Sequence, residues 1–394
     1  MANLFLFTAT YPYSNRETFL ESEIVYLSKE FDTIYIAPWS TENTSARMTP
    51  ENVIVTTDKV TSRKIKVIRC IKHPKILWLF LKDLIKNKVF LDRVKFREWA
   101  FEMYVCANIY EHPGLKLACQ EAKKGDVAYS YWGKVGIYSM LFLPKDVKKV
   151  SRFHGDWDLW EEKYHGYVPI RQKLLSKLDA VHFISEKGQE FMSKKYEMPA
   201  NFVSRLGTFD KGVSQKSQDG VLRVVSCSSI TTVKRVDLIM ESICRIKSRK
   251  VIWTHIGGGS MLDGLKEKAA NLLDQDIEIR LLGTKTNAEV LQYYNDNPVD
   301  VFVNLSSVEG IPVSIMEAIS FGIPVVATDV GGTSEIVNDE TGILVSPNPT
   351  TDEVANAIIS IVNKQISPRK FWEQYYMADK NYTAFVKNIK NELR

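Results

Sequence analysis

The sequence predicts an α/β fold with two parallel sheets, and three observations support this prediction. The chain has 394 residues, which is enough for two or three domains that each bury a core. Charged residues make up 25% and hydrophobic residues 45% of the chain, which is ordinary for a globular protein and argues against a disordered or fibrous one. Short β-branched or aromatic runs alternate with longer helical stretches, the order that produces doubly wound parallel sheets.

The expected strands fall into two series. The first series is 4–8, 33–37, 53–56, 127–131, 149–153, 180–184 and 202–205, and the second is 222–227, 250–256, 277–282, 300–305, 325–328 and 342–345. The polar, glycine-containing segment 207–220 lies between them and is the best domain boundary. We therefore expect two Rossmann-like domains, 1–207 and 208–367, that face each other across a cleft. An aromatic-rich C-terminal helix, 368–394, should pack back on the N-terminal domain.

The cysteines and the N-terminus favour a protein of the reducing cytoplasm. Five cysteines, an odd number without a CxxC pair, argue against a disulfide framework and a zinc knuckle. The first ten residues carry no basic leader, and their apolar run is too short for a signal peptide. We therefore expect a cytoplasmic protein whose first strand is buried.

Residues 63–98 form a strongly basic segment. It contains twelve Lys or Arg residues and three acidic ones, a local charge of +9 in a chain of net charge +5. Its apolar run 76–81 is too short to cross a bilayer, which needs about 20 residues. Residues 63–97 could rest on an anionic membrane surface as an amphipathic helix, or form the solvated outer face of ordinary helices. Nucleic acid is not an expected partner, because no recognised binding module accompanies the charges.

The most informative segment spans residues 300–328. A strand is expected to end near Leu305, a loop containing Gly310 follows, and Pro312 stands where a helix can begin. The first N–H groups of such a helix carry a partial positive charge. This helix start can therefore bind a phosphate or an oxyanion.

Two carboxylates flank the expected helix start. Glu309 precedes it, and Glu317 lies eight residues further on. A carboxylate accepts hydrogen bonds from a vicinal diol, and charged hydrogen bonds contribute about 1.5 to 3 kcal/mol each. Two diol-binding acids beside a phosphate cradle suit a nucleotide sugar. The plainer alternative is that Glu309 caps the helix and Glu317 is exposed on it.

The same residues resemble a known enzyme family. The spacing Glu309-x7-Glu317, together with Gly310, Pro312, Ala318, Gly322, Pro324, Val325 and the segment 329–335, is similar to the signature of retaining glycosyltransferases of family 4. The resemblance covers most of the C-terminal half and is weaker upstream. It implies the two-domain GT-B fold and retaining transfer of a hexose from a nucleotide diphosphate sugar, most commonly UDP-linked. The acceptor is a hydroxyl of a glycan or lipid-linked glycan, no metal or cofactor takes part, and similar enzymes serve capsule, exopolysaccharide and O-antigen synthesis.

The resemblance also implies a role for each matching residue. Glu309 contacts hydroxyls of the donor hexose, Glu317 holds the ribose diol, and Lys234 neutralises the leaving diphosphate. The donor-binding candidates are Glu317, the backbone amides of Gly310, Ile311 and Val313, and Arg235, Ser229 and Gly283.

The diphosphate-binding cations depart from the family pattern. The family usually has an arginine five residues before the lysine, whereas this chain has Ser229. Arg235 is the candidate substitute. Alternatively, Lys234 and Arg235 are solvated charges at a helix start.

In the first half, the segment 151–156 resembles the strand-end histidine of the family. It implies that His154 contacts the donor hexose or the incoming hydroxyl, although a structural histidine is the alternative. The acceptor-binding candidates are Tyr13, Asn15, Arg16 and Trp132. The run Asp156-Trp157-Asp158 spells a DxD metal motif, but such matches recur by chance and no metal is expected.

Two other functions stay open. A nucleotide-sugar epimerase can have the same fold and would need no acceptor. A non-catalytic nucleotide-sugar-binding subunit of a transferase complex would explain Ser229.

Overall fold

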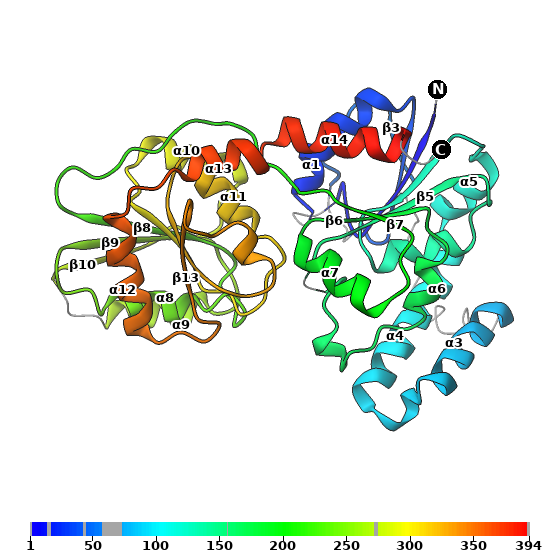
Figure 1. Cartoon of the computed structure of the whole chain (residues 1–394), viewed down its shortest axis with the longest axis horizontal. Coiled ribbons are helices and arrows are strands. Elements are labelled where there is room, and N and C mark those ends of the chain that lie inside the picture. The colour runs from blue at the N-terminus through cyan, green and yellow to red at the C-terminus, as the bar shows by residue number, and fades with distance from the viewer. Residues whose placement is uncertain are drawn as a thin grey trace. The chain divides into compact units, whose positions relative to one another are not determined.

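The computed structural model describes residues 2–13, 17–41, 45–56, 73–155, 157–271 and 275–391. These residues form two compact units. Unit 1 comprises Met1–Ser204 with Tyr382–Arg394, and unit 2 comprises Arg205–Asn381. Each unit contains a parallel β-sheet with helices around it (Figure 1). The prediction of a two-domain α/β fold is therefore confirmed, while the expected domain ranges stay predictions.

The sheet of unit 1 has seven strands in the order β3-β2-β1-β4-β5-β6-β7. Every neighbouring pair is parallel. The strands are β1 (Leu4–Thr8), β2 (Ile34–Pro38), β3 (Val53–Val55), β4 (Val127–Ser130), β5 (Lys148–Phe153), β6 (Ala180–Phe183) and β7 (Ala200–Val203). The helices are α1 (Phe19–Glu30), α3 (Pro74–Lys86), η2 (Val89–Leu91), α4 (Arg93–Tyr110), α5 (Pro113–Glu121), η3 (Val135–Leu141), η4 (Glu162–Tyr164), α6 (Arg171–Leu175) and α7 (Glu186–Lys195).

The sheet of unit 2 has six parallel strands in the order β10-β9-β8-β11-β12-β13. They are β8 (Leu222–Cys227), β9 (Val251–Ile256), β10 (Ile277–Leu281), β11 (Val301–Asn304), β12 (Val325–Thr328) and β13 (Gly342–Val345). The helices are α8 (Val236–Ile243), α9 (Leu262–Ala270), α10 (Asn287–Asp296), α11 (Val313–Ser320), η5 (Thr333–Glu335), α12 (Thr351–Val362) and α13 (Pro368–Tyr375).

The central strands are buried on both faces, which explains their continuous apolar sequences. All residues of β1, β4, β11 and β12 are buried. Since successive side chains point to opposite faces, both faces of each sheet must be covered by other elements. We therefore expect a ligand to bind at the loops that follow the carboxyl ends of the strands, rather than on a face of the sheet.

The strands lie where the sequence predicts them, with one shift at the edge of a sheet. We expected a strand at 202–205, whereas β7 spans Ala200–Val203. No residue of β7 is fully buried. An edge strand that is only partly covered has a weak apolar pattern, so its ends are hard to predict.

The C-terminal segment forms two helices rather than one. After α13, Met377 pairs with Thr208, because the Thr208 N–H donates to Tyr376 O at 3.0 Å and the Ala378 N–H donates to Thr208 O at 3.0 Å. The chain then continues as α14 (Ala378–Asn391). In unit 1, the ring of Phe385 lies 5.4 Å from Tyr129 and 4.9 Å from His182. The last helix thus completes the core of unit 1.

Helices long and apolar enough to cross a bilayer do not occur in the part of the chain that the structure describes.

Candidate functional site

The loop between β11 and α11 has the shape that the sequence predicts. Strand β11 ends at Asn304, and Pro312 is the N-cap residue of α11. The Gly332 N–H donates to Gly310 O at 2.9 Å and ties this loop to the one after β12. At Gly331, φ is +53° and a Cβ atom would lie 1.9 Å from Glu309 O. Only glycine fits there, so the close approach of the two loops explains Gly331.

Glu309 forms an ion pair with Lys234 at the ends of β11 and β8. The Lys234 ammonium donates to Glu309 Oε1, and the side chains are 26% and 11% exposed, respectively. The Asn304 amide donates to the same carboxylate oxygen at 3.5 Å. The Ser307 N–H donates to Val233 O at 2.8 Å and holds the two loops together. The structure thus brings together two of the three predicted catalytic residues.

Backbone N–H groups stand beside this ion pair. Among the described residues, no hydrogen-bond acceptor is found for the N–H groups of Gly310, Ile311 and Val313. Pro312, the N-cap residue, makes no side-chain cap for the helix. The N-cap residue of α11 is thus Pro312 rather than Glu309. These N–H groups and the helix dipole leave a partial positive charge that suits a phosphate.

Glu317 lies inside unit 2 rather than on its surface. It is 9% exposed, and Asn287 Nδ2 of α10 donates to its Oε1 at 2.5 Å. Burial raises the pKa of Glu317 to about 7, and the hydrogen bond from Asn287 opposes this shift. Burial also raises the pKa of Cys227 to about 12, with a smaller contribution from the charge of Glu317. The alternative that Glu317 is an exposed helix residue is wrong.

Arg235 binds carbonyl groups of the β11 loop. Its Nε donates to Leu305 O at 2.6 Å, and its Nη2 donates to Ser306 O at 2.9 Å. Its Nη1 donates to Asn348 Oδ1 at 3.3 Å. The described contacts of the guanidinium thus hold a loop in place.

Ser229 and Gly283 lie on neighbouring loops at the same sheet edge. Ser229 is exposed after β8, and the Ser228 N–H next to it donates to Ile256 O at 3.1 Å. The Gly257 N–H donates to Gly283 O at 2.9 Å, and φ of Gly283 is +70°. The loops after β8, β9 and β10 therefore meet, and the loop after β8 also carries Lys234.

His154 is the third predicted catalytic residue, and it lies in unit 1 at the end of β5. It is 6% exposed and packs against Phe19, Tyr131 and Trp132, whose ring centroids lie 6.0, 4.6 and 4.5 Å away. Among the described residues, neither ring nitrogen has a hydrogen-bond partner, and Nδ1 lies 3.8 Å from Asp158 Oδ2. Burial lowers the pKa of His154, although Asp158 opposes this shift. A neutral imidazole with two free nitrogens can contact a hydroxyl.

Asp158 has a structural role in the loop after β5. Its carboxylate accepts hydrogen bonds from the N–H groups of His154 at 3.2 Å, Gly155 at 2.9 Å and Gly133 at 3.0 Å. The other acid of the DxD run, Asp156, lies outside the described residues. The bonds to Asp158 fix the backbone on which His154 sits.

Glu17 is a residue that the sequence reasoning missed. It is 4% exposed, and its carboxylate accepts hydrogen bonds from the N–H groups of Ala9 at 3.0 Å, Thr10 at 2.7 Å and Tyr11 at 2.6 Å. The indole N–H of Trp132 donates to the same carboxylate at 2.5 Å. The only signal in the sequence is an acid a few residues after a strand, and such acids are usually exposed.

The predicted acceptor residues are only partly described. Trp132 lies beside His154, and its N–H is taken by Glu17. Tyr13 is half-buried, and its N–H donates to Thr10 O at 2.7 Å. Asn15 and Arg16 lie outside the described residues. The structure thus places Trp132 with His154 and Tyr13 in the loop after β1.

The comparison with known families agrees with this geometry. Residues 211–376, which lie in unit 2 and hold the Lys234–Glu309 pair, match the family model of glycosyl transferases group 1. This segment is therefore similar to the glycosyl transferases of group 1. The resemblance of the Glu309-x7-Glu317 segment to glycosyltransferases is therefore confirmed.

Curated relatives carry the same assignment. The amylovoran biosynthesis glycosyltransferase AmsK of Erwinia amylovora is 27% identical over 171 residues, which are 40% of this chain and 41% of that protein. The O-antigen biosynthesis glycosyltransferase WbnH of Escherichia coli is 29% identical over 269 residues, 64% of this chain and 73% of that protein. The putative colanic acid biosynthesis glycosyltransferase WcaL of Escherichia coli K12 is 27% identical over 240 residues, 57% of this chain and 59% of that protein. The chain is thus related to glycosyltransferases of bacterial polysaccharide biosynthesis.

Solved structures confirm the GT-B fold over the whole chain. The apo form of the lipopolysaccharide outer core galactosyltransferase WaaB has a TM-score of 0.68 and 13% identity, with 99% of each chain covered. HepE from Anabaena in complex with UDP-glucose has a TM-score of 0.64 and 14% identity, with 98% of this chain and 99% of that chain covered. At these identities the likeness concerns the fold alone.

Proposed function

We propose that this chain is a retaining glycosyltransferase of bacterial cell-surface polysaccharide synthesis. It transfers a hexose from a UDP-linked donor to a hydroxyl of a glycan or lipid-linked glycan, in the cytoplasm and without a metal or other cofactor. The observation that carries the proposal is the Lys234–Glu309 ion pair beside the N–H groups of the β11–α11 loop. A cation and helix N–H groups can bind a diphosphate, and a carboxylate next to them can bind sugar hydroxyls.

The donor is held by three parts of unit 2. The diphosphate accepts hydrogen bonds from the ammonium of Lys234 and from the N–H groups of Gly310, Ile311 and Val313. The hexose hydroxyls donate to Glu309, and the ribose diol contacts Glu317. The names of relatives and neighbours support this assignment, since HepE was solved with UDP-glucose.

The chemical step needs stabilisation of the leaving group rather than a protein nucleophile. The bond between the anomeric carbon and the diphosphate oxygen breaks, and a bond to the acceptor oxygen forms on the same face of the sugar. The acceptor proton passes to the leaving phosphate oxygen. Lys234 and the start of α11 stabilise the negative charge that develops there. His154, whose ring nitrogens have no hydrogen-bond partner within the described part of the chain, contacts the hexose or the acceptor hydroxyl.

A panel of labelled nucleotide sugars tests the proposal and its alternatives. The purified protein is incubated with each donor, with and without a lipid-linked acceptor, and the products are separated. Transfer that requires the acceptor supports the proposal, and the anomeric configuration of the product, read by NMR, must equal that of the donor. A changed sugar formed without acceptor would indicate an epimerase. Donor binding without any product would indicate a non-catalytic subunit.

A further inference from the structure

A helical hairpin at the edge of unit 1 exposes an unusual set of apolar side chains. Helices α3 and α4, joined by η2, lie side by side there (Figure 1). We define the α3–α4 face by the following side chains: Trp78, Ile85, Phe90, Leu91 and Phe96, which are 44 to 74% exposed, and Lys82, Lys86, Lys88, Arg93, Lys95 and Arg97. Large apolar groups gathered on one surface mark an interaction site more often than isolated ones do.

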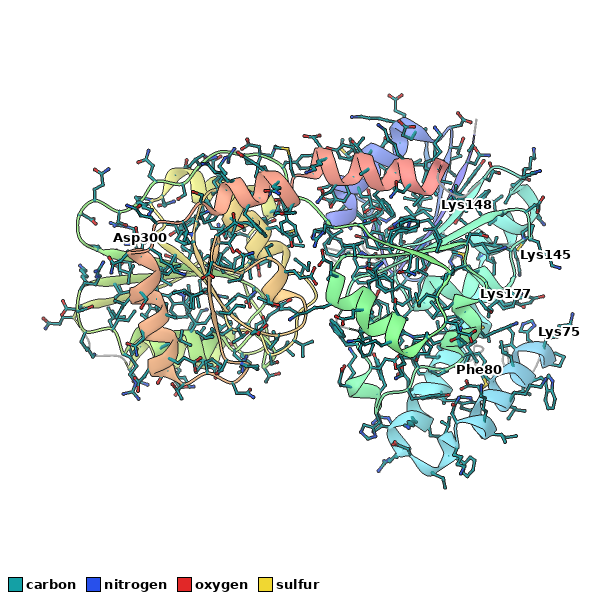
Figure 2. The ribbon with its side chains drawn as sticks, in the orientation of Figure 1. Lys75, Phe80, Lys145, Lys148, Lys177 and Asp300 are labelled. Carbon is teal, nitrogen blue, oxygen red and sulfur yellow. The ribbon has the colours of Figure 1, made fainter. Side chains whose placement is uncertain are left out.

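The exposed residues are not the ones that hold the hairpin together. On α3, Ile76 and Phe80 are buried, and Phe80 O accepts the indole N–H of Trp99 at 2.8 Å. Figure 2 shows Phe80 on the inner part of the hairpin, and Lys75 at the surface of unit 1. Trp78 and Ile85 are seven residues apart on another side of the same helix, so they share a face. The hairpin core is therefore complete without the α3–α4 face.

The acidic residues of the hairpin are bound internally. Asp83 accepts from the Tyr167 hydroxyl and from the Ile170 N–H at 3.2 Å. Asp92 caps α4 by accepting from the Val94 N–H at 2.8 Å. The acids of α4 are thus turned into unit 1 as well. Glu98 and Glu102 form ion pairs with the buried ammonium of Lys134.

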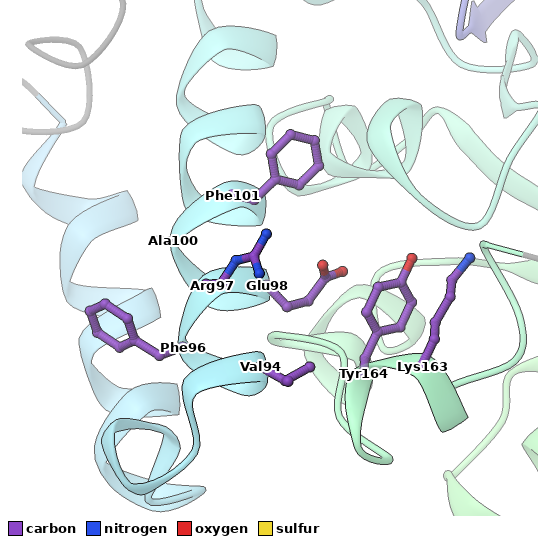
Figure 3. Close-up of a pocket in the computed structure, with 8 residues that line it drawn as sticks. All are labelled: Val94, Phe96, Arg97, Glu98, Ala100, Phe101, Lys163 and Tyr164. Atoms are coloured by element: carbon purple, nitrogen blue, oxygen red, sulfur yellow. The ribbon is translucent and has the colours of Figure 1, made fainter.

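The basic residues of the hairpin point outward. Lys82 lies over the ring of Trp78, with Nζ 4.9 Å from the ring centroid. None of the six basic side chains of the α3–α4 face forms a salt bridge with another described residue. On α4, Figure 3 shows Phe96 directed toward α3 and Glu98 directed toward Tyr164, with Arg97 between them. Internal pairing of the acids therefore leaves a surface that is both apolar and positively charged.

We propose that the α3–α4 face binds the surface of an anionic lipid bilayer. Charge complementarity selects this partner, because unpaired Lys and Arg side chains meet lipid phosphates while Trp and Phe side chains enter the interface. The α3–α4 face lies in unit 1, whereas Lys234 and Glu309 lie in unit 2, so this inference does not depend on the glycosyl transfer. Of the basic segment 63–97 that the sequence singles out, residues 63–72 lie outside the described residues, and the α3–α4 face lies within residues 78–97.

Vesicle sedimentation of the full-length protein tests the proposal. At low salt, the protein should sediment with vesicles containing phosphatidylglycerol and bind at least about tenfold more weakly to phosphatidylcholine vesicles. Raising the salt should release it, since exposed charges are screened. Absence of sedimentation with the anionic vesicles at low salt would overturn the proposal.

Two sets of substitutions separate the apolar and the charged contributions. Trp78→Ser/Ile85→Ser/Leu91→Ser and Lys82→Glu/Lys86→Glu/Lys88→Glu should each weaken binding to anionic vesicles at least about tenfold. Quenching of tryptophan fluorescence by brominated lipids should be smaller for Trp78→Phe than for the natural chain. If both triple variants sediment like the natural chain, the face is not the binding surface.

Matched controls exclude unfolding and a general charge effect. Lys123→Glu/Lys124→Glu/Lys145→Glu makes the same change in net charge at exposed positions of unit 1, and Ile54→Ser removes an apolar side chain that is 49% exposed. Both controls should keep vesicle binding, and all variants should keep the thermal unfolding midpoint within a few degrees and the affinity for UDP. Equal loss in the charge control would show that only net charge matters and would overturn the assignment to the α3–α4 face.

Discussion

Lys234 and Glu309 belong to different loops, and their contact is the feature from which the proposed chemistry follows. In the structure each satisfies the charge of the other. When a donor binds, its diphosphate contacts the ammonium and its hydroxyls donate to the carboxylate. The donor thus replaces each partner of the ion pair for the other. The ion pair therefore keeps the ammonium and the carboxylate in position for the donor. Because the two charges neutralise each other, their partial burial costs little free energy.

The first prediction concerns these two side chains. Lys234→Ala and Glu309→Ala should fold normally, because both groups are partly exposed, and each should lower the transfer rate about 10²- to 10³-fold. Initial rates with saturating donor measure the effect. Lys364→Ala, which breaks the exposed pair with Asp339 in the same unit, is the control and should be fully active. Natural turnover in both site variants would remove them from the mechanism.

The second prediction concerns the raised pKa of Glu317. Its usual value of 4.5 rises to about 7 in the folded state, because burial favours the neutral form. The stability that this neutral form contributes is complete below about pH 4.5 and is lost as the pH rises through 7, up to about 3 kcal/mol.

Urea unfolding at pH 5 and pH 8 measures this contribution. The natural chain should lose more stability between the two values than Glu317→Gln, which cannot ionise. The same pH dependence in both proteins would show that Glu317 does not titrate in this range.

At the scale of elements, glycines decide how closely the loops of unit 2 approach. The loops after β8, β9 and β10 meet at Gly257 and Gly283, and those after β11 and β12 meet at Gly331. These contacts place Lys234 and the free N–H groups at one sheet edge. Loop shape, rather than the sheet, therefore sets the geometry of the site.

The third prediction follows from Gly331. Gly331→Ala forces a Cβ atom against Glu309 O in a left-handed conformation, so it should destabilise the protein by about 1 to 3 kcal/mol and weaken UDP binding. Thermal unfolding and calorimetric titration with UDP measure the two effects. Gly264→Ala is the control: it lies in α9 with free space around it, so alanine should stabilise by about 0.5 to 1 kcal/mol. Equal effects of the two substitutions would contradict this account of Gly331.

At the scale of the whole chain, residues remote in sequence complete each unit. The last helix supplies Phe385 to the core of unit 1, where the guanidinium of Arg152 lies 4.5 Å from its ring centroid. Arg152 is buried and bound to Glu23 at 2.6 Å. The first and last parts of the chain therefore fold as one core.

The fourth prediction tests this packing. Phe385→Ala removes a ring that is 1% exposed and should cost about 3 to 5 kcal/mol of unfolding free energy. Lys387→Ala, an exposed position of the same helix, should change it by less than about 0.5 kcal/mol. Chemical denaturation measures both, and an equal effect of the two changes would show that the helix contributes no buried packing.

The sequence by itself determined the strands, the α/β class and the segment that carries Glu309 and Glu317. Local apolar patterns and a Gly-Pro helix boundary suffice for these, because they depend on neighbours in the chain. Only the tertiary structure decided that Glu309 pairs with Lys234, that Glu317 is buried against Asn287 and that Glu17 binds Trp132. It also divided the terminal segment into two helices and turned the acids of α4 inward. Burial and charge pairing join residues from 30 to 115 positions apart, and no local pattern records such contacts.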